Sequence, residues 1–183
     1  GGSFARAKEM ALADSKGFQE CLLKLSDVTA RYLISQIRHG ADTVQLFDSW
    51  AGLVPDACFE DWVIAPTKRI IDQVRAAAPD VPVIGFPRQA GAHYAAYAAE
   101  TGIAALGLDP QADIASMPRH VCLQGNLDSE KLLAGGDTMR RAALDILAAA
   151  EGRPFVFNLG HGVIKETPPE HRSEERRVGK ECR

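Results

Sequence analysis

Five short apolar runs alternate with segments of helical periodicity along this chain, and that alternation limits the fold more than any other feature. The strand-like runs span about residues 43–48, 81–86, 103–108, 121–125 and 155–159. Helical segments are expected at about residues 3–14, 18–40, 56–78, 92–100 and 137–150, with a single turn at 113–117. Strands alternating with helices are typical of parallel βαβ units. The sequence therefore predicts an α/β fold in which about five parallel strands are joined by intervening helices.

Composition narrows the classes of protein and partner. The chain has 183 residues, 46% of them hydrophobic and 25% charged, which suits one globular domain with a core. A formal charge of −3 gives no electrostatic basis for binding nucleic acid. No apolar run approaches the ~20 residues of a membrane span, and no secretory signal opens the chain, so no membrane partner is expected.

The cysteines and the two ends of the chain carry further expectations. Four cysteines are scattered without a CxxC pair, which predicts reduced thiols and a cytoplasmic protein. The chain opens on Gly1-Gly2-Ser3 with no methionine, so we expect its beginning to lie elsewhere. Residues 173–183 are mostly charged and have no apolar face, so we expect a disordered or artefactual tail unrelated to residues 1–172.

Polar residues follow each predicted strand. If the strands are parallel, these residues lie on one rim, where (β/α) barrels build their sites. They are Asp48, Ser49, Trp50, Arg88, Gln89, Asp109, Asn126, Asp128 and His161. His161 stands between Gly160 and Gly162 after the run 155–159, which is apolar enough for a strand buried on both faces. An imidazole placed there can donate or accept a hydrogen bond, although a histidine packed under a tight turn fits the pattern equally well.

Four segments in order resemble the uroporphyrinogen decarboxylase family. They are Val-Gln-Leu-Phe-Asp-Ser-Trp-Ala-Gly at 44–52, Ala-Leu-Gly-Leu-Asp at 105–109, Leu-Gln-Gly-Asn-Leu-Asp at 123–128 and Phe-Asn-Leu-Gly-His-Gly at 157–162, followed by Pro-Pro-Glu-His at 168–171. The resemblance implies a cofactor-free TIM-barrel enzyme of haem and chlorophyll synthesis. It removes carbon dioxide from the four acetate groups of uroporphyrinogen III to give coproporphyrinogen III, and the full-length protein is a homodimer.

The resemblance carries substrate contacts onto two residues of this chain. It implies that Ser49 hydrogen-bonds a substrate carboxylate, and that His161 contacts a carboxylate or supports proton movement nearby. The family's catalytic aspartate, its arginines and a tyrosine are expected N-terminal to this sequence. No catalytic residue, cofactor-binding residue or metal ligand is therefore expected here. The chain is expected to be an incomplete TIM barrel that is inactive alone, because five strands cannot close an eight-stranded barrel.

Two alternatives stay open. The same barrel superfamily includes zinc-dependent, corrinoid-linked methyltransferases that use a His-x-Cys motif, and His120-Val121-Cys122 has that spacing. This motif lies at the start of a predicted strand instead of at its end, so a buried Cys122 that packs as a small hydrophobe is favoured. The second alternative is a fragment without catalytic activity that only associates with other chains.

Overall fold

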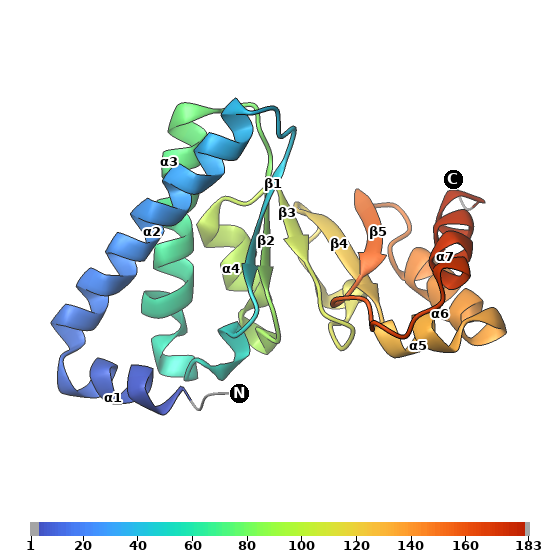
Figure 1. Ribbon diagram of the computed structural model, residues 1–183, viewed down its shortest axis with the longest axis horizontal. Coiled ribbons are helices and arrows are strands. Elements are labelled where there is room, and N and C mark those ends of the chain that lie inside the picture. Colours follow the sequence, from blue (N-terminus) through green and yellow to red (C-terminus); the bar gives the residue numbers. More distant parts are fainter. Residues whose placement is uncertain (1–3, 182–183) are drawn as a thin grey trace.

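One five-stranded sheet organises the computed structural model, which describes residues 4–181 and the side chains of all of these except 176 and 179–181 (Figure 1). The strands are β1 (Val44–Asp48), β2 (Val83–Pro87), β3 (Ala105–Gly107), β4 (Cys122–Leu127) and β5 (Phe155–Leu159). Every neighbouring pair is parallel, and the spatial order β1-β2-β3-β4-β5 is the order in the chain. The predicted α/β class with five parallel strands is confirmed, and it has the arrangement of an incomplete TIM barrel.

The helices form two groups, one near each end of the strand order (Figure 1). Helices α2, α3 and α4 lie beside β1 and β2, whereas α5, α6 and α7 lie near β4 and β5. The helices are α1 (Ala5–Ala13), α2 (Ser15–Arg38), α3 (Ala65–Ala77), α4 (Tyr94–Thr101), α5 (Ser129–Ala134), α6 (Gly136–Ala149) and α7 (Pro169–Glu181). Short 3-10 turns at 51–53, 56–58, 91–93 and 114–116 and a π-helical turn at 60–64 complete the connections. No helix within residues 4–181 is long and apolar enough to cross a bilayer.

Local chemistry explains where several helices begin and end. The Asp14 carboxylate accepts the Gly17 backbone N–H at 2.9 Å and caps α2, which ends before Gly40 at φ 99°. Pro66 lies in the first turn of α3, as expected, because its missing N–H needs no partner there. Ser3, the expected cap of α1, lies outside the described residues. Helix α5 was not expected from the sequence.

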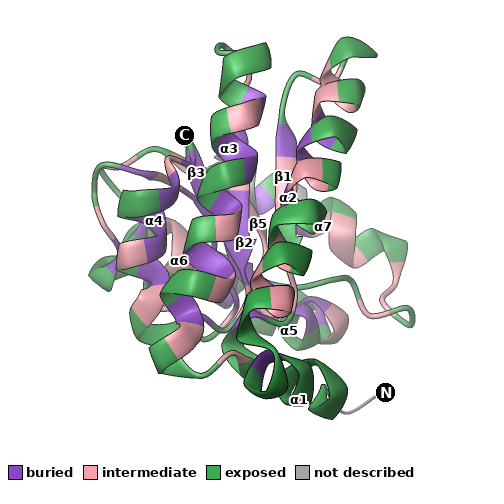
Figure 2. Cartoon of the chain, turned by 90° about the vertical axis from the view of Figure 1, so that its left-hand side faces the viewer, coloured by how far each residue is buried: buried purple, intermediate pink, exposed green. Residues whose placement is uncertain are grey.

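The core lies between the helices and the outer face of the sheet. Leu106 and Leu123 are fully buried there, and a second cluster joins Leu127 to Leu132 and Met139 beside α6. Among the strands, the buried residues concentrate on β2, β3 and β4. Figure 2 shows buried residues also on the inward sides of α3, α4 and α6, while α1 and much of α2 are exposed. The helices therefore cover one face of the sheet.

The opposite, inner face of the sheet is largely open. Side chains alternate along a strand, so Phe47 and Val156 point to this face, and they are 67% and 46% exposed. The expectation that the run 155–159 is buried on both faces is therefore wrong, because no described element covers Val156. The Gln124 Nε2 donates to the Gln45 Oε1 at 3.1 Å, although β4 and β1 are separated by two other strands. The sheet must curve towards its inner face for these side chains to meet.

Helix α7 runs from Pro169 to Glu181 and packs against α5 and α6. The Arg172 Nη1 donates to the Glu175 Oε2 at 2.8 Å, and Glu175 and Val178 are each only 2% exposed. The predicted tail is thus helical as far as Glu181. That residues 173–183 are foreign to residues 1–172 stays a prediction.

Candidate functional site

Ser49 directly follows β1 at the carboxyl end of the sheet. The preceding carboxylate of Asp48 accepts the Trp50 backbone N–H at 3.3 Å and so bends the chain around Ser49. Burial raises the pKa of Asp48, and the backbone N–H groups of Trp50 and Ala51 oppose that rise. The local turn therefore fixes the Ser49 backbone, and it does not use the Ser49 hydroxyl.

His161 is held in a turn whose backbone is fixed on both sides. The Gly160 N–H donates to the Leu127 carbonyl at 2.9 Å, and the Ser129 hydroxyl donates to the Gly162 carbonyl at 2.7 Å. Gly160 is buried so closely against Pro110 that an added Cβ would lie 2.6 Å from the Pro110 Cδ. The backbone is therefore tied to β4 and α5, and the His161 imidazole remains exposed.

Ser49 and His161 both line one cavity of about 350 Å³ on the inner face. Its other lining residues are Gln45, Phe47, Phe86, Gly107, Leu108, Gln124, Asn158, Leu159, Gly160, Gly162, Val163 and Arg172. None of these described lining residues is an aspartate or glutamate. Within residues 4–181, the Ser49 hydroxyl and the His161 ring have no hydrogen-bond partner. The structure therefore brings the two predicted site residues to one cavity, while their role as substrate contacts stays a prediction.

Sequence reasoning missed several polar side chains in this cavity. Gln45, Gln124 and Asn158 lie inside apolar strands, and only strict alternation along each strand could have assigned them to the inner face. Arg172 also lines the cavity, but its guanidinium is paired with Glu175. The cavity is therefore rich in neutral hydrogen-bonding groups.

The remaining polar residues of the rim mainly hold the loops together. Asp109 is 3% exposed, and its carboxylate accepts the Tyr94 hydroxyl, the Gln89 N–H at 2.8 Å and the Gln111 N–H at 3.1 Å. Burial and the Asp109 hydrogen bond both raise the pKa of Tyr94. The Asn126 Nδ2 donates to the Asp109 carbonyl at 3.0 Å. Asp109 and Asn126 therefore position the loops and do not face the cavity.

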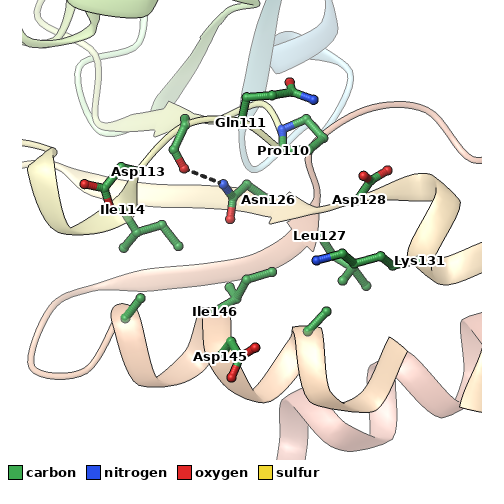
Figure 3. Close-up of a pocket in the computed structure, with 13 residues that line it drawn as sticks. Pro110, Gln111, Asp113, Ile114, Asn126, Leu127, Asp128, Lys131, Asp145 and Ile146 are labelled. Carbon is green, nitrogen blue, oxygen red and sulfur yellow. Dashed lines mark hydrogen bonds between the residues drawn. The ribbon is translucent and has the colours of Figure 1, made fainter. Parts of the chain in front are cut away.

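A second cavity of about 420 Å³ lies between the end of β4 and α6 (Figure 3). Three of its lining residues are Asp113, Asp128 and Asp145, and Lys131 is its one basic residue. The Asp128 carboxylate accepts the Glu130 N–H at 2.9 Å and caps α5. The acidic lining disfavours a polycarboxylate ligand, so this cavity does not compete with the first one for such a ligand.

The His120-Val121-Cys122 motif lies apart from both strand-end turns described above. Cys122 begins β4, where its Sγ lies 3.7 Å from the Leu123 carbonyl and burial raises its pKa, while His120 is exposed. Among the described residues, no three His, Cys, Asp or Glu side chains come together as metal ligands. No observation in residues 4–181 therefore favours a zinc site built on this motif.

Comparison with known proteins gives a consistent match. The sequence model of the uroporphyrinogen decarboxylase (URO-D) family matches residues 1–174. Uroporphyrinogen decarboxylase of Gluconacetobacter diazotrophicus is 50% identical over 172 residues, which cover 92% of this chain and 49% of that protein. The enzyme of Sphingopyxis alaskensis is 48% identical over 171 residues, or 91% of this chain and 50% of that protein. The chain spans about half the length of the curated relatives it matches.

Proposed function

Because this chain belongs to the uroporphyrinogen decarboxylase family, we propose that it forms the C-terminal half of a carboxy-lyase. The whole enzyme removes carbon dioxide from the four acetate groups of uroporphyrinogen III and yields coproporphyrinogen III for haem synthesis. The observation that carries the proposal is the shared cavity of Ser49 and His161, whose described lining contains no carboxylate.

The lining suits a ligand that carries many carboxylates. The Ser49 hydroxyl can donate one hydrogen bond, and each His161 ring nitrogen can donate when the ring is protonated. Both groups are free of partners within the described residues, so no protein hydrogen bond is lost when a ligand binds. We assign Ser49 to holding a carboxylate, and His161 to holding a carboxylate or a proton beside it.

We further propose that the chain alone does not decarboxylate at a useful rate. Protonation of a pyrrole builds positive charge, and a fixed anion that meets it commonly contributes several kcal/mol. The first cavity has no such anion among its described lining residues. The family's aspartate is expected in the half of the relatives that this chain does not span. The open inner face also admits water, which weakens electrostatic contacts.

The proposal is tested by supplying the other half in trans. The purified chain is mixed with the N-terminal half of the Gluconacetobacter diazotrophicus relative, and enzymatically generated uroporphyrinogen III is added. We expect coproporphyrinogen III only in the mixture, and we expect His161→Ala to abolish it. His120→Ala removes an exposed histidine outside the cavity and serves as the matched control. Product from the chain alone, or a mixture that forms a complex but has activity independent of His161, would contradict the proposal.

Two further expectations belong to the same proposal. Cys21, Cys58 and Cys122 are free thiols, which suits a reducing compartment such as the cytoplasm. The homodimer implied by the family is proposed for the full-length enzyme only. Light scattering on the reconstituted mixture measures its mass and tests the dimer.

A further inference from the structure

Asn158 contributes an amide side chain to the cavity that holds Ser49 and His161. It lies on β5, three residues before His161, and it lines the same cavity. Its Oδ1 accepts the Leu159 backbone N–H at 2.9 Å. That bond fixes the orientation of the amide and occupies its oxygen. No described residue accepts from the Nδ2, so Asn158 offers two free N–H donors.

Gln45 offers a second amide of the same kind from β1. Its Oε1 accepts the Gln124 Nε2 at 3.1 Å, which fixes the Gln45 oxygen towards β4. Within residues 4–181 the Gln45 Nε2 has no acceptor. Asn158 and Gln45 therefore both line the cavity with a paired amide oxygen and, within the described residues, an unpaired amide nitrogen.

The balance of donors and acceptors identifies the ligand chemistry. An ionised carboxylate has about four lone-pair sites and accepts only, so it binds best where several donors converge. The cavity offers donors from Asn158 and Gln45 in addition to Ser49 and His161. Within the described part of the chain, Gln124 leaves one unpaired amide oxygen in the same lining, because its Nε2 is bonded to Gln45, so the donors outnumber this acceptor. The cation of Arg172 is already paired with Glu175. A competing carboxylate is absent from the described lining.

We propose that Asn158 and Gln45 form a carboxylate cradle with Ser49 and His161, and that Asn158 is a specificity-determining residue for the substrate. The identity of the ligand as a tetrapyrrole rests on the proposed function. The amides stay neutral at every working pH, so their N–H groups can donate to a carboxylate without a change of protonation. A methyl group in the same place would leave these N–H donors unpaired, so the cradle favours a carboxylate-bearing arm over a decarboxylated one.

The test compares two substitutions that each add one negative charge. Asn158→Asp keeps the side-chain shape and an acceptor for the Leu159 N–H, but it replaces the donors by a carboxylate oxygen. Gln111→Glu adds the same charge at an exposed position outside this cavity and controls for the overall field. Fluorescence titration measures the Kd for uroporphyrin III, the stable oxidised form of the proposed substrate. We expect Asn158→Asp to raise Kd about tenfold or more and Gln111→Glu to change it less than about twofold.

A second measurement follows the Asn158 amide directly. Its side-chain NH2 signals in a ¹⁵N–¹H spectrum are assigned by their loss in Asn158→Asp, and the wild-type chain is titrated with uroporphyrin III and with benzene-1,3,5-tricarboxylate. We expect both ligands to shift these signals.

The two probes separate the cradle from the proposed function. A response to the tricarboxylate without binding of uroporphyrin III would support the cradle and refute the tetrapyrrole assignment. Binding of uroporphyrin III with unmoved Asn158 signals and an unchanged Kd in Asn158→Asp would refute the cradle alone. Failure of the folded chain to bind either probe would refute both.

Discussion

Replacing Gly160 by alanine tests how the His161 turn is held. An added Cβ would lie 2.6 Å from both the Pro110 Cδ and the Pro110 nitrogen, and 2.9 Å from the Asp109 carbonyl carbon. Side-chain carbons essentially never approach this closely. The obstacle is mostly backbone, and the Asp109 carboxylate is anchored by three hydrogen bonds, so this segment cannot easily give way. We therefore expect the His161 turn to move instead.

The size of the effect follows from the cost of overpacking. Forcing an extra methyl group into a packed site commonly costs about 1–3 kcal/mol of the free energy of unfolding. For a chain of this length, each kcal/mol lowers Tm by roughly 2–4 °C, so Gly160→Ala should melt about 2–12 °C lower than wild type. Displacement of the imidazole should also weaken uroporphyrin III binding.

Gly162→Ala provides the matched control because an added Cβ there meets nothing within 4 Å. Both substitutions change the unfolded chain alike, so that contribution cancels when the two are compared. Differential scanning calorimetry gives Tm, and fluorescence titration gives Kd. If Gly160→Ala melts within about 1 °C of Gly162→Ala and binds uroporphyrin III equally well, then Gly160 does not hold the His161 turn in place.

Burial raises the folded-state pKa of Asp48, so ionisation of this residue lowers stability as pH rises through that pKa. Asp48→Asn should therefore raise Tm at pH 7. The difference in Tm from wild type should shrink as the pH falls, because wild-type Asp48 then becomes protonated. A difference in Tm that grows towards low pH would contradict this reasoning. The Arg153 guanidinium donates to four main-chain carbonyls between residues 114 and 121. Arg153→Lys should therefore lower the free energy of unfolding by about 2 kcal/mol, as measured by urea titration. An unchanged urea midpoint of unfolding would contradict this. Strands β1 and β5 leave open edges of the described sheet, so the chain should self-associate, which light scattering would detect. Val156→Lys on β5 should reduce the self-association more than Leu12→Lys on α1 does. Equal effects of the two substitutions would show that the contact does not involve the β5 edge.

The sequence was enough for the sheet because its signals are local. Runs such as Val83–Phe86 are apolar and are bounded by turn-forming or polar residues. Pro66 marks the start of a helix because its ring fixes the backbone and removes the N–H. Helix α5 was missed because Asp128 was interpreted only as a residue at a strand end, although it also caps the next helix. Helix α7 was not expected because its sequence has no apolar face, and the burial of Glu175 and Val178 depends on neighbours that the sequence does not specify.

Which rim residues hold the loops and which line the cavity could not be predicted in the same way. Asp109 and His161 both follow strands in the sequence. The Asp109 carboxylate is used in hydrogen bonds from Tyr94 and Gln89, which lie in the connection between β2 and β3, and these contacts are visible only in the structure. Asn158 was hidden in an apolar run, and Gln45 meets Gln124 only because the sheet curves. These assignments depend on three-dimensional neighbours that sequence spacing does not specify.

The spatial order β1-β2-β3-β4-β5 has a consequence for folding of the chain during its synthesis on the ribosome. Each new strand can join an edge that already exists, so the sheet can grow in the direction of synthesis without waiting for a later strand to insert. The cavity, however, takes Ser49 from the end of β1 and His161 from the end of β5. A ligand that contacts both residues can therefore bind only after β5 has been synthesised, and its binding would link the two outer strands of the described sheet.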